Sequence, residues 1–90
     1  MSDAARQRVL AAALEVVENQ LRADDPPETR ETFDRLMEEG HSDAEAKALI
    51  AAVVLTEMVD ILRTSAPFNR ARFVESLDRL PALPHGVGED

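Results

Sequence analysis

The sequence contains no cysteine, only two histidines and only three glycines. The lack of cysteine excludes disulfide bonds, thiolate metal ligands and cysteine nucleophiles. His41 and His85 do not have the spacing of a metal-binding HExxH motif, and no glycine-rich phosphate loop is present. The serines lie in no nucleophile-elbow setting. We therefore expect a protein that is not an enzyme and that binds no cofactor.

Long hydrophobic runs are also missing. No run approaches the roughly 18 apolar residues that a membrane span needs, and the N-terminus has no signal-peptide pattern. With 90 residues, of which 44% are hydrophobic and 31% charged, the chain has the size and composition of one small globular domain. We expect a cytoplasmic protein with a single domain over residues 1–81, a flexible tail over residues 82–90 and no membrane association.

Basic residues are scarce, and the formal net charge is −8. Most of this charge comes from residues 24–45, where nine acidic residues stand against Arg30 and Arg35 and give −7. No stripe of Lys and Arg exists that could bind a phosphate backbone, so nucleic-acid binding is not expected. The acidic segment could instead dock a basic protein, with Glu38 and Glu39 as its test residues.

The pattern of apolar residues predicts an all-α fold. Apolar residues recur at steps of three and four, and no stretch alternates as a half-buried strand would. Because the connections are short, the helices favour a four-helix up-and-down bundle, which their unequal lengths would splay. The predicted helices cover residues 3–23, 26–39, 43–64 and 70–80.

Capping residues set these boundaries. Ser2 and Asn69 are suited to cap the first and fourth helices, and Asp25 is suited to cap a second helix that begins with Pro26. Ser42 and Glu45 have the spacing of a capping box. The second helix is expected to stop at Gly40, and Phe68 is placed to pack on Phe73 as a hydrophobic staple.

Each predicted helix has an inward face. The first and third helices are longer than the second and fourth, so part of their apolar faces should remain uncovered unless a homodimer buries it. The predicted inward residues are Leu10, Leu14, Val17 and Leu21; Thr29, Phe33, Leu36 and Met37; Ala46, Leu49, Ile50, Val53, Val54, Met58 and Ile61; and Phe73, Val74, Leu77 and Leu80.

Glu57 is the most unusual residue. At 100° per residue it falls between Val53 and Ile61, near the centre of the apolar face of the third helix. Burying a charged group costs several kcal/mol unless it is paired. Glu57 should therefore be protonated, bonded to an arginine or glutamine, or bound to a metal. Arg22 and Arg63 are candidate partners, and Glu15, Glu18 and Gln20 could share the site.

Several segments resemble a group of small bacterial proteins of unknown function. The pieces are NQL at 19–21, DDPPET at 24–29, RLM at 35–37 with Gly40, the region of Glu57, and PFN with RFVESLDRLP at 67–81. Members of that group carry histidines beside acidic residues, which implies a metal site. At the matching positions this chain has Leu10, Leu14, Ala44 and Ala48, while Glu15, Glu45 and Glu57 are carboxylates. Without imidazole ligands, binding of a hard cation by oxygen atoms is the form of metal site that remains.

Two functions follow as expectations. The first is a non-catalytic module that self-associates or binds another protein through its uncovered apolar faces. The alternative is a metal-binding, or formerly metal-binding, helical protein with Glu57 as the buried ligand and Glu15 or Glu45 assisting.

Overall fold

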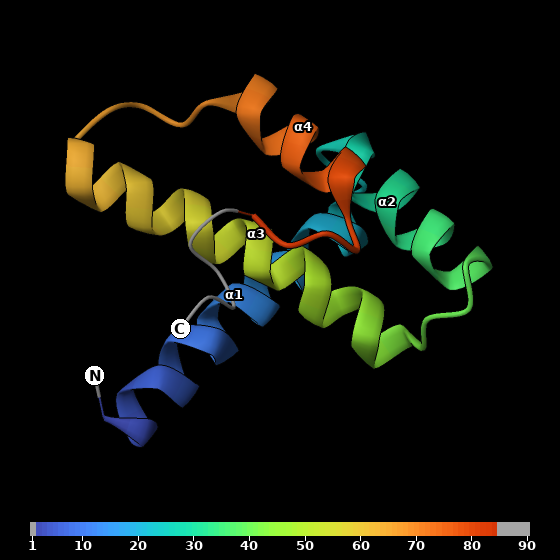
Figure 1. Ribbon diagram of the computed structural model, residues 1–90, viewed down its shortest axis with the longest axis horizontal. Coiled ribbons are helices and arrows are strands. Elements are labelled where there is room, and N and C mark those ends of the chain that lie inside the picture. Colours follow the sequence, from blue (N-terminus) through green and yellow to red (C-terminus); the bar gives the residue numbers. More distant parts are fainter. Residues whose placement is uncertain (1, 85–90) are drawn as a thin grey trace.

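The computed structural model describes residues 2–84 and consists of four helices joined by short connections (Figure 1). The helices are α1 (Asp3–Ala23), α2 (Pro27–Glu38), α3 (Asp43–Thr64) and α4 (Arg70–Arg79), and no strand occurs within these residues. The predicted all-α fold is confirmed. Among the described residues, no helix has the length and apolarity needed to cross a membrane.

Helix α3 is the centre of the arrangement, because it packs against each of the other three helices. Figure 1 shows α1 crossing α3, with its N-terminal half projecting away from the other helices. Helices α2 and α4 contact each other and both contact α3. The N-terminal half of α1 is therefore left with little of the chain to cover it.

Three helices begin at the predicted caps. Ser2 Oγ accepts a hydrogen bond from the backbone N–H of Ala5 at 3.1 Å, and Asn69 Oδ1 accepts one from Arg72 at 2.9 Å. The capping box of α3 is complete, since the Glu45 N–H donates to Ser42 Oγ at 3.1 Å and the Ser42 N–H donates to Glu45 Oε1 at 2.7 Å. These bonds satisfy backbone donors that the first turn of a helix leaves free.

The start of α2 differs from the prediction. The helix begins at Pro27, and its N-cap is Pro26 without a side-chain hydrogen bond, so Asp25 is not the cap. It ends at Glu38, one residue early, and α4 likewise ends at Arg79. Gly40 has a φ of +101°, and the N–H of His41 donates to Leu36 O at 3.1 Å. This is the glycine-dependent helix ending that was predicted.

The core lies where α1, α2 and α4 meet α3. Nearly all predicted inward residues are buried or half-buried, but the prediction was wrong for Leu10 and Met37, which are 43% and 41% exposed. Leu10 lies in the projecting half of α1. Met37 lies beside the buried stripe of the short helix α2, which consists of Thr29, Thr32, Phe33 and Leu36.

Two further predictions concern the C-terminal part. Phe68 packs on Phe73 with ring centroids 5.5 Å apart, which confirms the predicted staple. Beyond α4, Leu80 is buried and the Ala82 N–H donates to Arg79 O at 2.9 Å. The predicted flexible tail began at residue 82, and its residues 85–90 lie outside the described part of the chain.

Candidate functional site

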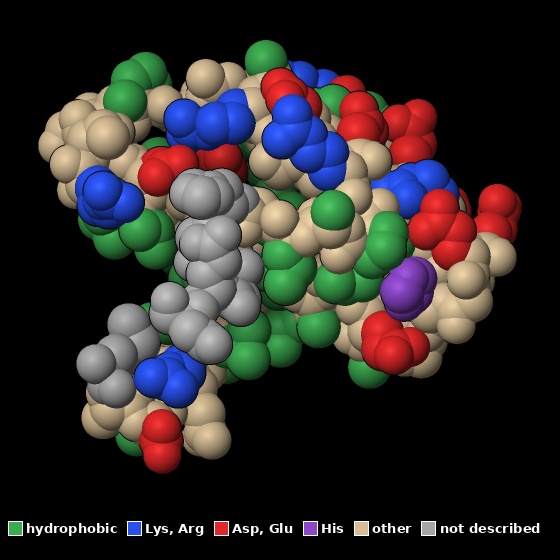
Figure 2. All heavy atoms as spheres, in the orientation of Figure 1, with side chains coloured by type: hydrophobic (Ala, Val, Ile, Leu, Met, Phe, Trp, Pro, Cys, Tyr) green, Lys and Arg blue, Asp and Glu red, His purple; other side chains and the backbone are tan. Residues whose placement is uncertain are grey.

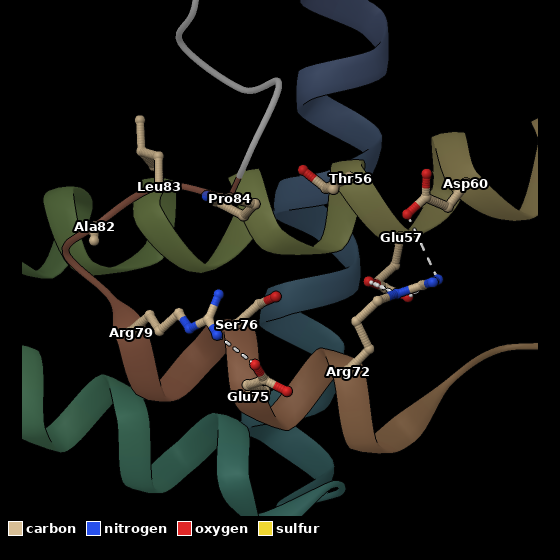
Figure 3. A pocket seen from close by; sticks show the side chains of 10 residues that line it. All are labelled: Thr56, Glu57, Asp60, Arg72, Glu75, Ser76, Arg79, Ala82, Leu83 and Pro84. Atoms are coloured by element: carbon tan, nitrogen blue, oxygen red, sulfur yellow. Dashed lines mark hydrogen bonds and ion pairs between the residues drawn. The ribbon is translucent and has the colours of Figure 1, made fainter.

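A surface pocket lies between α3 and α4 (Figure 3). It has a volume of about 390 Å³, and residues 82–84 border it on one side. Most of the side chains that line it are polar or charged. The lining residues are Thr56, Glu57, Asp60, Arg72, Glu75, Ser76, Arg79, Ala82, Leu83 and Pro84.

Glu57 forms the buried end of this pocket and binds Arg72. Only 3% of Glu57 is exposed. Arg72 Nε donates to Glu57 Oε2 and Arg72 Nη2 donates to Glu57 Oε1, both at 3.0 Å, and Nη2 also lies 3.5 Å from Asp60 Oδ2. Bonding to an arginine was one of the three predicted states of Glu57. The partner is Arg72, however, and neither Arg22 nor Arg63.

The position of Arg72 in α4 explains how the pair forms. Asn69 caps this helix, which places Arg70 and Arg72 in its first turn, where no acidic residue is present. Positive charge is unfavourable at a helix N-terminus because of the helix dipole. Both arginines reach carboxylates of other helices, since Arg70 Nη2 donates to both oxygens of Glu28 at 2.8 Å. Arginines in an unfavourable first turn are thus a signal in the sequence for tertiary partners, and apolar periodicity alone does not reveal it.

Charged side chains of the pocket form ion pairs with each other. The bonds to Glu57 raise the pKa of Arg72. Arg79 donates to Glu75 one turn away on the same helix, and the Thr56 hydroxyl donates to Ala52 O at 3.0 Å. The carboxylates of Glu57 and Glu75 are therefore occupied by guanidinium groups. The Glu57–Arg72 pair joins α3 to α4, whereas the Glu75–Arg79 pair lies within α4.

The predicted metal ligands are not brought together. Glu45 lies in the capping box at the start of α3, about 18 Å along the helix from Glu57 at 1.5 Å per residue. Glu15 is exposed on α1. Of the other candidates for this site, Gln20 accepts a hydrogen bond from the buried Thr29, and Glu18 pairs with Lys47. Within residues 2–84 no three His, Cys, Asp or Glu residues are close enough to hold a metal ion.

A second pocket of about 270 Å³ lies where α1, α2 and the start of α3 meet. Lys47 Nζ is 3.0 Å from carboxylate oxygens of both Glu18 and Asp43, which raises its pKa. It also lies 5.9 Å from the ring centroid of Phe33, a distance suited to a cation–π contact. As in the larger pocket, the cation is held by groups of the same chain.

Several carboxylates of the acidic segment from residue 24 to 45 are paired within the protein. Four of its carboxylates pair with basic side chains of the protein: Glu28 with Arg70, Asp34 with Arg30, Glu39 with Arg35, and Asp43 with Lys47. Glu39, one of the two predicted docking residues, is therefore engaged within its own helix. Glu38 is exposed.

The second candidate surface is apolar. Leu10 on α1 and Val59 and Leu62 on α3 are exposed, and Leu62 has 82% of its surface in solvent. Leu14, Leu55 and Met58 lie at the edge of the core and are half-buried. Figure 2 shows hydrophobic side chains on the side where α1 diverges from the C-terminal half of α3. We call Leu10, Val59 and Leu62 the exposed apolar face.

Comparisons with protein-family models, curated proteins and solved structures gave no match to this chain. The features of the molecule that bear on function are the pockets described above and the exposed apolar face.

Proposed function

We propose that the protein is a non-catalytic module that associates with protein through its exposed apolar face. The observation that carries this proposal is the exposure of Leu62 and Val59, which have 82% and 42% of their surface in solvent on the central helix. Removing apolar surface from water stabilises an interface by about 25 cal/mol per Å². A partner that covers both side chains together would remove the largest apolar area from water and so stabilise the interface most.

The sequence of α1 supports the same proposal. Residues 9–14, VLAAAL, form more than one turn of helix without a polar side chain on any side. A helical segment that is apolar all round is normally buried. Here only Ala13 of this segment is buried, while Leu10, Ala11 and Ala12 are exposed. Association would give this segment the apolar surroundings that its composition suits.

The larger pocket supports the non-catalytic part of the proposal. Its buried carboxylate binds Arg72 through both oxygens, and Arg79 binds Glu75. A catalytic carboxylate needs a free oxygen that faces the substrate, and a catalytic guanidinium needs a free N–H group that does so. The Glu57–Arg72 pair is of the kind that fixes α4 on α3, and the Glu75–Arg79 pair stays within α4.

Sedimentation velocity from micromolar to millimolar concentration tests the proposal. We expect the mean mass to rise with concentration, and we expect Val59→Glu to abolish the rise because the carboxylate would have to be desolvated in the interface. Met37→Glu is the matched control, since Met37 is 41% exposed but lies on α2. A wild-type protein that stays monomeric at millimolar concentration would contradict the proposal.

A further inference from the structure

The uncovered side of α3 carries a heptad pattern. Its residues follow each other at steps of four, three, four and three, which is the spacing that forms the seam of a coiled coil. Each is exposed or half-buried, and none is charged. These residues, named the α3 seam below, are Ala48, Ala52, Leu55, Val59 and Leu62.

The remaining sides of α3 are occupied by the chain itself. Ile50, Ala51, Val53 and Glu57 are buried, and Lys47 pairs with Glu18 of α1. The seam runs over 15 residues, or about 21 Å at 1.5 Å per residue. Four turns of helix are thus available for a partner helix.

From the order of side-chain sizes along the seam, we infer that its occupant is a second copy of this chain with its α3 antiparallel. The two smallest residues, Ala48 and Ala52, lie at the N-terminal end, and the exposed Val59 and Leu62 lie at the C-terminal end. This inference rests on the proposed function and names the partner, the helix and the register.

An antiparallel pair centred on Leu55 fills the seam evenly. It places Ala48 level with Leu62 of the partner subunit, and Ala52 within one residue of Val59 of the partner subunit. Large residues then face small ones, which is how well-packed cores interdigitate. A parallel pair would set Ala48 on its own copy and Ala52 on its own copy, which leaves the N-terminal end of the seam underfilled.

Charges beside the seam favour the same orientation. Glu45 lies three residues before Ala48, at the next step of the seam pattern, and Arg63 directly follows Leu62 at the other end. Glu45 precedes Leu55 by ten residues and Arg63 follows it by eight. The antiparallel pair therefore brings Glu45 near Arg63 of the partner subunit, on both sides of the symmetry axis. Opposite charges at flanking positions help to set helix orientation in coiled coils.

Oxidative cross-linking tests the register. Because the chain has no cysteine, Leu55→Cys introduces a single thiol next to the predicted symmetry axis, where two copies come within reach of a disulfide. We expect mild oxidation of dilute protein to give a covalent dimer. The Met37→Cys control, on α2, should remain monomeric. A non-covalent dimer whose Leu55→Cys form does not cross-link would overturn the register and leave the proposed function standing.

A size exchange gives a second test that uses exposed positions only. Leu62→Ala and Ala48→Leu should each weaken the dimer about tenfold or more, because one leaves a gap and the other crowds the seam. The double variant restores a large residue opposite a small one, so its dissociation constant should return to within about threefold of the wild type. Additive weakening in the double variant would refute the antiparallel pairing. Val59→Glu separately reports whether the apolar face associates at all.

Discussion

Arg72 and Glu57 form a two-pronged ion pair that joins the first turn of α4 to the buried side of α3, with both N–O distances at 3.0 Å. Glu57 is buried, whereas the side chain of Arg72 is 46% exposed. The pair therefore satisfies a carboxylate inside the protein with a guanidinium that keeps part of its hydration. This asymmetry determines what removal of either residue should do.

Removal of Arg72 alone is expected to be strongly destabilising. Arg72→Met keeps most of the aliphatic stem but leaves Glu57 buried without its partner, which should lower the free energy of unfolding by about 2 to 3 kcal/mol. Urea denaturation followed by circular dichroism measures the change. Arg79→Met is the control, because its pair with Glu75 is exposed and should contribute less than about 1 kcal/mol.

Replacing both Glu57 and Arg72 should lower the free energy of unfolding far less than replacing Arg72 alone. In Glu57→Met/Arg72→Met no charge is left buried, and apolar side chains fill the space, so stability should lie within about 1 kcal/mol of the wild type. A double-mutant cycle with both single variants then isolates the coupling between the two residues. If the double variant is as unstable as Arg72→Met, the loss does not come from an unpaired Glu57.

Arg35 of α2 binds backbone carbonyls at the C-terminal end of α4. Its Nη1 donates to Leu80 O at 2.9 Å and its Nη2 donates to Leu77 O at 3.0 Å, so one side chain satisfies two carbonyls of another helix. Arg35→Met should lower the free energy of unfolding by about 1 to 2 kcal/mol. Amide exchange should accelerate chiefly in the last turn of α4. Arg30→Met, whose contact with Asp34 is within α2, should leave that exchange unchanged.

The capping box of α3 predicts a dependence on pH. Hydrogen bonding from the Ser42 backbone and side chain lowers the pKa of Glu45 from its ordinary value of 4.5. Because the folded pKa lies below the unfolded one, the ionised carboxylate adds stability above the unfolded pKa and loses it as pH falls through the folded value. The stability difference between the wild type and Glu45→Gln should therefore shrink in acid. Urea titrations at neutral and acidic pH measure it, with the exposed Glu31→Gln as control; a constant difference would contradict the capping role.

Chelation is expected to leave the protein unchanged. Both oxygens of Glu57 bind Arg72, and the helix separates Glu57 from Glu45 by more than three turns. Native mass spectrometry before and after chelation should therefore give the same mass, and added divalent cations should not shift the melting temperature. A bound metal that is lost with Glu57→Gln would support the alternative function instead.

Helix boundaries followed from the sequence because they depend on contacts within a few residues. Ser2, the Ser42–Glu45 box and Asn69 cap their helices as predicted, and each bond spans three residues. A proline-rich start was harder to place, because Pro26 and Pro27 both fit the first turn and the structure uses the second. The unusual position of Glu57 was also evident from periodicity alone, as was its need for a partner.

The identity of that partner was decided only by tertiary structure. Arg22, Arg63 and Arg72 are equal candidates by residue type, and the packing of α4 against α3 brings Arg72 to Glu57. Exposure of Leu10 was likewise set by where α1 extends beyond its neighbours (Figure 1). Periodicity determines which residues share a side of a helix. Which side is covered depends on how helices of unequal length cross, and that is a property of the whole chain.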